Sequence, residues 1–200
     1  MIILLSVHDI TLIGEYIILR PPRSEDLEGL SDAAIDGEIW NNPYAFFPQV
    51  KDMSIYLQNM IKHDESFIPL IIVQKETNII IGTTRFLNID KDNHRVEIGH
   101  TWIAKSFRRT AVNTESKLLM LQYAFEKLNC IAVEIRTDVL NLVSRKAIER
   151  LGASQDGILR NHKIMRDGRI RNTVCYSITR DESSEILKNL MAKLSNHKEY

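Results

Sequence analysis

Phe107-Arg-Arg-Thr-Ala-Val-Asn-Thr-Glu115 lies between a strand-like segment, residues 95–104, and a segment with leucines at helical spacing, residues 117–128. It therefore predicts a short turn that leads into a helix N-terminus. Such a turn presents unpaired backbone N–H groups and the positive end of the helix dipole. With two adjacent arginines, this arrangement is typical of a phosphate-binding site. A plain strand-to-helix connection with two solvated arginines explains the same residues equally well.

Composition limits the classes of protein that fit. The 200 residues are 44% hydrophobic and 26% charged, which predicts one globular domain of ordinary kind. The formal net charge is zero, so neither nucleic acid nor a membrane surface is an expected partner. The two cysteines, Cys130 and Cys175, are too few to staple a secreted scaffold. The apolar start, residues 1–5, has no basic region and is too short to span a membrane, so the expected location is the cytoplasm.

The order of elements predicts a mixed sheet. Strands that short turns connect over residues 67–104 favour an antiparallel meander. The strand, helix and strand over residues 95–137 favour a crossover connection and parallel pairing. Asp167-Gly168, between two further strand-like runs, is a strong hairpin signal. The strand-like segments are residues 15–22, 67–74, 79–88, 95–104, 131–137, 158–165 and 170–178. One α+β domain accounts for these features.

Two blocks of the sequence resemble a known family. The first runs Val96-Glu-Ile-Gly99 and then Arg108 through Leu118, and the second runs Thr137-Asp-Val-Leu-Asn141 through Gly152-Ala153. Together they resemble the acetyl-CoA-binding segments of the GCN5-related N-acetyltransferase (GNAT) superfamily. The branch is similar to the ribosomal-protein N-terminal acetyltransferases of the RimJ/RimL type. The resemblance extends from about Gly14 to about Leu194.

This resemblance implies a fold and a division of the chain. The expected fold is a mixed, mostly antiparallel, twisted sheet of about six to seven strands, with about four helices plus a C-terminal helix. One parallel pair, the strand that ends near Ala104 and the strand over residues 131–137, is expected to splay apart. Residues 1–13 are expected to form an N-terminal extension, residues 14–180 the acetyltransferase domain, and residues 181–200 a C-terminal helix and tail.

The implied activity is transfer of an acetyl group from acetyl-CoA to a primary amine, by direct attack in a ternary complex and without a metal. The acceptor is a protein N-terminus or a small-molecule amine. By the resemblance, Glu97 is the general base, and Ser144 donates to the leaving thiolate where many members have a tyrosine. Glu97 could instead pair with an arginine and only orient the cleft. A non-catalytic acyl-CoA-binding or partner-binding module on the same fold is the alternative.

The resemblance also assigns residues to the cosubstrate. Backbone N–H groups near Trp102, Ile103 and Ala104 are expected to bind the pantetheine arm, and Asn141 also contacts that arm or only caps its helix. Lys146 is a candidate for the 3′-phosphate. The pyrophosphate is expected on the turn that comprises Arg108, Arg109, Thr110, Ala111, Val112, Asn113 and Thr114. Ala111 stands where the family pattern has glycine, so its methyl group fits if φ is negative and weakens binding if φ is positive.

The acceptor side is predicted from aromatic residues. Trp40, Tyr44 and Phe46 lie in a proline-bounded segment that either lines a binding cleft or pads the core. His100 is a second candidate base or a substrate contact. A C-terminal leucine stripe over residues 187–194 either covers the domain's own sheet or pairs with a second copy, in which case the protein is a homodimer.

Overall fold

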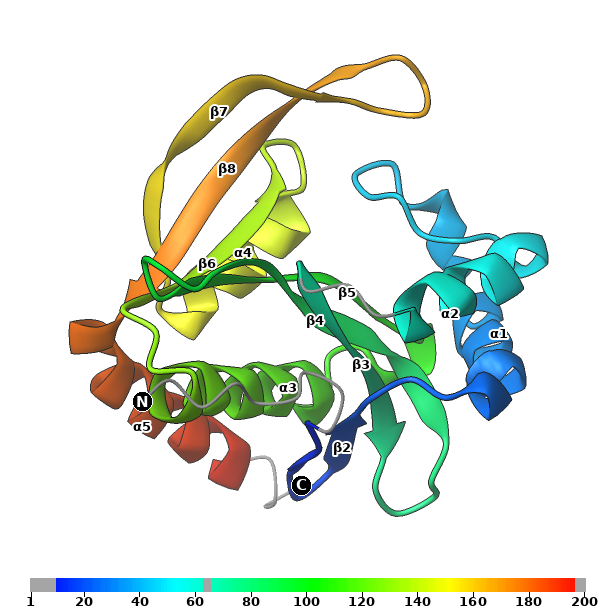
Figure 1. Cartoon of the computed structure of the whole chain (residues 1–200), viewed down its shortest axis with the longest axis horizontal. Coiled ribbons are helices and arrows are strands. Elements are labelled where there is room, and N and C mark those ends of the chain that lie inside the picture. The colour runs from blue at the N-terminus through cyan, green and yellow to red at the C-terminus, as the bar shows by residue number, and fades with distance from the viewer. Residues whose placement is uncertain (1–9, 63–65, 197–200) are drawn as a thin grey trace.

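The computed structural model describes residues 10–62 and 66–196 and arranges them around one open sheet (Figure 1). The sheet has eight strands in the order β1-β2-β3-β4-β5-β6-β8-β7. All neighbours are antiparallel except β5 and β6, which are parallel, as the meander and the crossover predicted. The strands are β1 (Leu12–Ile13), β2 (Ile17–Arg20), β3 (Phe67–Gln74), β4 (Ile80–Asp90), β5 (Arg95–Ile103), β6 (Ala132–Asp138), β7 (Ser154–Ile164) and β8 (Ile170–Thr179).

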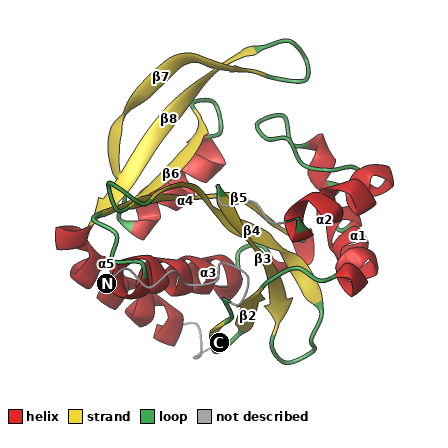
Figure 2. Cartoon of the chain, in the orientation of Figure 1, coloured by secondary structure: helices red, strands yellow, loops and turns green. Residues whose placement is uncertain are grey.

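The strand count exceeds the prediction because of β1, whose two residues pair with β2. This short strand lies inside the predicted N-terminal extension, most of which falls outside the described residues. The predicted GNAT-type α+β fold is confirmed, with helices on both faces of the sheet (Figure 2). The helices are α1 (Leu27–Ile35), α2 (Met53–Ile61), α3 (Ala111–Gln122), α4 (Leu142–Leu151) and α5 (Arg180–Ser195).

Two apolar layers hold the helices on the sheet. The main core lies between the sheet and helices α3, α4 and α5, and a smaller core lies beneath α1 and α2 on the other face. Residues of the C-terminal stripe, Leu190 and Leu194, are buried in the main core. The stripe therefore covers the domain's own core, which is the first of its two predicted roles.

Helix α3 begins at Ala111, six residues before the predicted start at Lys117. Thr110 is its N-cap, and the Thr110 hydroxyl oxygen accepts a hydrogen bond from the Val112 N–H. The first turn carries small or polar side chains, so the leucine spacing that predicted the helix does not reach it. A π-helical turn, Tyr123–Lys127, extends the C-terminal end.

The parallel pair separates after a short joint. Strands β5 and β6 pair only at Arg95↔Ala132, Val96↔Val133 and Glu97↔Glu134. Beyond that point β6 continues beside β8, while β5 continues beside β4 (Figure 1). A β-bulge at His100, whose φ is 49°, shifts the register of β5 against β4 between Gly99 and Trp102. The splayed pair that the resemblance implied is therefore present.

Candidate active site

Glu97 is the last residue of the joint between β5 and β6, and its side chain lies on the face of the sheet opposite α3. Alternation along β5 puts its neighbours Val96 and Ile98 in the main core. Glu97 is 8% exposed, and its Oε2 accepts a hydrogen bond from Asn88 Nδ2 at 2.7 Å and lies 3.5 Å from Arg136 Nε. Burial raises the pKa of Glu97, and the Arg136 charge and the Asn88 hydrogen bond offset this only in part. The carboxylate is thus both buried and paired with an arginine.

Glu134 faces Glu97 across the joint, and its pKa is shifted in the opposite direction. Arg95 Nη2 lies 2.6 Å from one of its oxygens, and Arg136 Nη2 lies 2.7 Å from the other. Burial alone would raise the pKa of Glu134, but the hydrogen bonds from these two arginines lower it overall. Two adjacent carboxylates with their pKa values shifted in opposite directions are a pattern found in acid–base sites. Glu97 is the one suited to accept a proton.

His100 lies at the β5 bulge, and part of its surface is exposed. Desolvation by the surrounding protein, followed by the positive charges of Arg85, Lys163 and Arg171, lowers the pKa of His100 to about 4. The imidazole is therefore neutral at pH 7 and is a weak proton acceptor there. This disfavours the predicted role of His100 as a second base and leaves its role as a substrate contact as a prediction.

The arginine turn sits at the N-terminus of α3, where the prediction placed it. Arg108 donates from Nε to the Ile103 carbonyl at 2.9 Å, which fastens the turn to the end of β5. Arg109 has a left-handed φ of 63° and is exposed, as is Thr110. Ala111 is the first helical residue and lies outside the positive-φ positions, so its methyl group fits without strain.

The side chains of Ala111 and Val112 are buried, so only their backbone can face a ligand, whereas Asn113 and Thr114 are half-buried. The exposed arginines and the free end of the helix suit a diphosphate. The turn thus fits the pyrophosphate that the resemblance assigned to it.

The backbone of β5 limits the predicted pantetheine contacts. Ala104 donates its N–H to the Ile81 carbonyl at 2.8 Å, so that N–H is not available to a ligand, which corrects its predicted role. N–H groups alternate along a strand, so the Trp102 N–H also faces β4 and the Ile103 N–H faces the splayed gap. The Trp102 side chain packs in the smaller core, with its Nε1 3.4 Å from the Tyr56 hydroxyl. Of the three residues, Ile103 keeps the predicted role.

The N-terminus of α4 follows β6. Asn141 is the N-cap, and its Oδ1 accepts a hydrogen bond from the Ser144 N–H at 3.0 Å. Ser144 lies half-buried in the first turn, with its hydroxyl unpaired among the described residues. Arg145 donates to the Tyr176 hydroxyl at 3.1 Å, while the next residue, Lys146, is exposed. Capping is therefore observed for Asn141, and its contact with the pantetheine stays a prediction.

The predicted aromatic segment divides between the two roles foreseen for it. Trp40 is half-buried and packs against the smaller core, whereas Phe46 is 37% exposed. The tip of the β7–β8 hairpin reaches this segment: Arg171 donates to the Tyr44 carbonyl at 3.2 Å, and the guanidinium of Arg166 lies 5.5 Å from the centre of the Phe46 ring. Tyr44 and Phe46 thus contact the hairpin tip, and Trp40 mainly pads the core.

A polar network on β4 was missed by the sequence analysis. The Tyr56 hydroxyl on α2 accepts from Arg85 Nη2 at 3.0 Å and lies 3.2 Å from the Thr83 hydroxyl. Arg85 is only 9% exposed. A single charged residue inside the apolar run of residues 80–89 was the available signal, because an arginine is rarely buried without a purpose.

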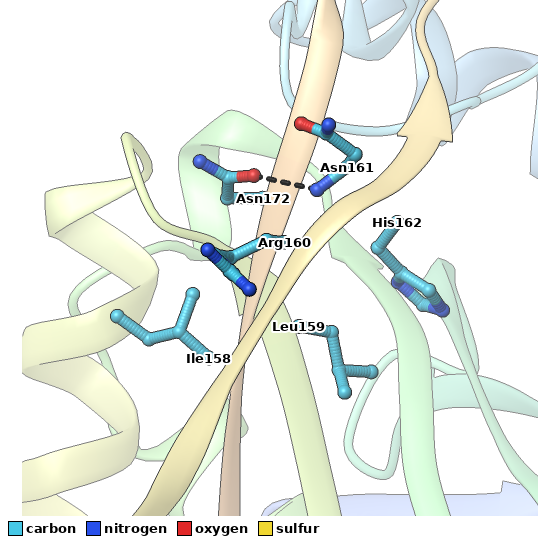
Figure 3. A pocket seen from close by; sticks show the side chains of 6 residues that line it. All are labelled: Ile158, Leu159, Arg160, Asn161, His162 and Asn172. Atoms are coloured by element: carbon cyan, nitrogen blue, oxygen red, sulfur yellow. Dashed lines mark hydrogen bonds between the residues drawn. The ribbon is translucent and has the colours of Figure 1, made fainter.

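An open hollow of about 860 Å³ lies along the β7–β8 hairpin (Figure 3). It is lined by Ile158, Leu159, Arg160, Asn161, His162 and Asn172. A bulge at Asn161, whose N–H donates to the Asn172 side chain at 2.8 Å, gives the hairpin its kink there. None of the predicted catalytic residues lines this hollow.

Comparison with known proteins tests the family. The profile of the acetyltransferase (GNAT) domain matches residues 17–154. The chain belongs to the GNAT acetyltransferase family. Members use acetyl-CoA and act on amines, and the predicted family is confirmed.

Relatives and solved structures agree with this assignment. An uncharacterized N-acetyltransferase, p20 of Bacillus licheniformis, is 27% identical over 86% of this chain and 97% of its own length. The putative ribosomal N-acetyltransferase YdaF of Bacillus subtilis is 26% identical over 85% of this chain and 94% of its own, which is consistent with the predicted branch. A GCN5-related N-acetyltransferase from Brucella melitensis has a similar fold, with a TM-score of 0.83, 24% identity, and coverage of 92% of this chain and 85% of its own.

Among residues 10–62 and 66–196, no group of three or more His, Cys, Asp or Glu side chains could hold a metal ion. Within the same ranges, no helix has the length and apolar character needed to cross a bilayer.

Proposed function

We propose that this protein transfers the acetyl group of acetyl-CoA to a primary amine by direct attack in a ternary complex. The observation that carries the proposal is the position of Glu97. It is a buried carboxylate with a raised pKa, at the point where two parallel strands part. An amine acceptor arrives protonated at neutral pH and must lose a proton before it attacks. A base with raised pKa at the mouth of the gap meets that need.

The chemistry divides between two sides of the gap. The amine nitrogen forms a bond to the acetyl carbon, the carbon–sulfur bond breaks, and the proton of the amine passes to Glu97 directly or through a water. Asn88 and Arg136 hold the Glu97 carboxylate in place. Ser144, at the start of α4 with its hydroxyl unpaired in the described structure, donates a hydrogen bond to the departing thiolate. The thiolate takes the second proton, which the nitrogen releases as the amide forms.

Binding of the donor rests on the two helix N-termini that border the gap. The exposed Arg109 and Thr110 and the first turn of α3 hold the pyrophosphate, and the Ile103 N–H meets a carbonyl of the pantetheine arm. Asn141 contacts the same arm, and Lys146 is exposed and free to pair with the 3′-phosphate. Bound acetyl-CoA supplies the activated thioester. The acceptor enters from the opposite face, between the hairpin arm and the segment with Tyr44 and Phe46.

The name of YdaF, a putative ribosomal N-acetyltransferase, supports a protein N-terminus as one acceptor class. A small-molecule amine is the other. A panel of acceptors that includes both peptides and small amines would distinguish these two acceptor classes.

The test combines binding with turnover. Acetyl-CoA is expected to raise the melting temperature of the protein, and free thiol is expected on addition of peptides with free N-termini or small amines. Glu97→Gln is expected to lower kcat on the order of 100-fold or more while the acetyl-CoA shift persists. Glu134→Gln is the matched control, because Glu134 is held by two arginines and retains an acceptor oxygen as glutamine. A melting shift without thiol release from any amine would instead support the non-catalytic binding module.

A further inference from the structure

The face of the sheet that holds Glu97 also holds an arginine in an unusual setting. Arg85 on β4 is 9% exposed and lies between two aromatic rings, its guanidinium carbon 5.7 Å from the centre of Tyr56 and 5.3 Å from that of Phe67. One terminal nitrogen donates to the Tyr56 hydroxyl. Its Nε is buried, and in the described structure it has no hydrogen-bond partner. A buried donor left unpaired on a charged group is costly unless a ligand completes it.

Two further cations share this face. Arg171 on β8 is half-buried. Among the described residues it donates to two neutral oxygens, the Thr173 hydroxyl at 2.9 Å and the Tyr44 carbonyl at 3.2 Å. Lys163 faces Arg171 in the register of β7 and β8. Arg85 pairs with Gly99 in the register of β4 and β5, next to the bulge at His100. The positive charges of Arg85, Lys163 and Arg171 all lower the pKa of His100, which agrees with their position on this face.

Their lack of carboxylate partners separates these cations from their neighbours. Arg95, Arg136 and Arg169 each form an ion pair with a glutamate or aspartate at 2.6 to 2.7 Å. Over residues 10–62 and 66–196, Arg85, Arg171 and Lys163 form none. The chain as a whole has zero formal net charge, so this excess is local. Glu97 acts on Lys163 and Arg171 at longer range, and Asp138 acts on Arg171, without an ion pair to either cation. Positive charge that lacks a direct ion-pair partner favours an anionic ligand.

The position of this cluster excludes the phosphates of acetyl-CoA as its partner. The pyrophosphate turn belongs to the N-terminus of α3, which packs against Val96 and Ile98 on one face of the sheet. Arg85 contacts Tyr56 of α2 on the other face, where Glu97 also lies. The cations therefore face the acceptor.

We propose that Arg85, Arg171 and Lys163 form an anion subsite beside Glu97, and that the preferred acceptor is a primary amine that also carries a carboxylate or a phosphate. This inference rests on the proposed acetyl transfer and names its substrate class. Glu97 takes the proton of the amine, while the oxyanion pairs with Arg171 and Lys163 and is attracted by the positive charge of Arg85. An arginine can bind either oxyanion through two nitrogens, so the chemistry is shared by both groups.

The test uses matched acceptors that differ only in the anion. The pairs are an amino acid and its carboxamide, a peptide that begins Ser-Glu and one that begins Ser-Gln, and an aminoalkyl phosphate and the corresponding amino alcohol. The wild-type protein is expected to favour the anionic member of at least one pair in kcat/KM, on the order of 10- to 100-fold. The pair with the largest ratio identifies the source of the oxyanion.

Substitutions then test which residues cause the preference for the anionic acceptor. Arg85→Met and Arg171→Gln are expected to remove most of it through KM, with kcat/KM for the neutral members changed by less than about threefold. Arg160→Gln is the control, since Arg160 also lies on β7 but points to the opposite side of the ribbon from His162 (Figure 3). If Arg85→Met fails to fold, as judged by its melting curve, Arg171→Gln carries the test, because Arg171 bonds only to Thr173 and Tyr44.

Three outcomes separate this inference from the proposed function. Equal kcat/KM for charged and neutral partners, with thiol release intact, overturns the subsite and leaves acetyl transfer standing. An anion preference that survives both substitutions also overturns it. If no amine releases thiol, the proposed acetyl transfer is wrong, and calorimetry then tests the subsite with an N-acetylated amino acid and its carboxamide. Tighter binding of the acid, abolished by both substitutions, supports the subsite. Equal affinity for the acid and the amide overturns it.

Discussion

A buried lysine makes the stability of this protein depend on pH in an unusual direction. Lys117 in α3 is 6% exposed, and its ammonium donates to the Thr101 hydroxyl at 2.8 Å. No carboxylate among the described residues pairs with it. Burial lowers the pKa of Lys117 from its ordinary 10.5 to about 7. We predict that Lys117→Met stabilises the protein at pH 7.

The magnitude follows from the size of the pKa change. A fall from 10.5 to about 7 is roughly 3.5 units, and at 1.36 kcal/mol for each unit the charged lysine costs about 5 kcal/mol. Between these two pKa values the unfolded chain holds a proton that the folded chain has released. The free energy of unfolding of the wild type therefore rises with pH, by up to about 1.4 kcal/mol for each pH unit. The cost is fully present below pH 7 and absent above about pH 10.5.

Urea unfolding at pH 7, 8, 9 and 10 measures this difference. The gap between Lys117→Met and wild type is expected to be about 4 kcal/mol at pH 7 and to close toward pH 10. Thr101 keeps the Thr84 hydroxyl at 2.8 Å as a partner, so the substitution leaves no unpaired hydroxyl. Lys188→Met, at an exposed position, is the control and should follow the wild type. Parallel stability curves for Lys117→Met and wild type, or a less stable variant at pH 7, would refute the reasoning.

Four further predictions concern single residues. The apparent pKa of the acid limb in the pH–rate profile is expected to lie above that of an ordinary glutamate, because burial raises the pKa of Glu97. If the same limb persists in Glu97→Gln, Glu97 is not its source. Glu115→Ala is expected to cost about 3–5 kcal/mol in urea unfolding, since its carboxylate accepts three backbone N–H groups at 2.6, 2.8 and 2.9 Å; a loss under about 1 kcal/mol contradicts this. Gly82→Ala should lower the melting temperature and raise the KM for acetyl-CoA, because the added Cβ would lie 2.1 Å from the Trp102 carbonyl oxygen; unchanged values would contradict the close approach. Asn141→Ala should lower the free energy of unfolding by about 1 kcal/mol, whereas Asn141→Asp should change it little because Asp also caps a helix. If the Asp variant binds acetyl-CoA more weakly in calorimetry, the Asn141 amide makes a contact beyond capping; unchanged binding would show that it does not.

Elements with strong periodicity were predictable and their exact starts were not. The α4 boundaries followed from Asn141 and Gly152, which are the N-cap and a left-handed C-cap with φ of 101°. The start of α3 was placed too late, because the buried Ala111 and Val112 are followed by the polar Asn113 and Thr114, so the leucine spacing begins only at Leu118. The two-residue β1 has no pattern of its own and exists only through its pairing with β2.

Those parts of the candidate site that lie within one continuous stretch of sequence could be predicted. Glu97 and the arginine turn lie on consecutive segments, and each has a local signature. The Arg85 network was not predictable, because it depends on α2 packing over β4 and brings together residues 29 positions apart. The carboxylate environment of Glu97 was likewise set by Arg136 on β6, whose distance depends on the parallel register. Contacts between residues so far apart in the sequence have no local sequence pattern from which they could be predicted.

The three-residue joint between β5 and β6 has a mechanical consequence. Hydrogen bonds of the sheet hold its two halves together only from Arg95 to Glu97, so the angle between the halves is set elsewhere. Helix α5 follows β8 in one half and packs beneath the sheet on α3, which follows β5 in the other. The α3–α5 interface and the contacts between the hairpin tip and the segment with Tyr44 therefore help to set the distance between the two halves. Evolution or engineering can therefore widen or narrow the gap through the α3–α5 interface, at residues remote from both substrates.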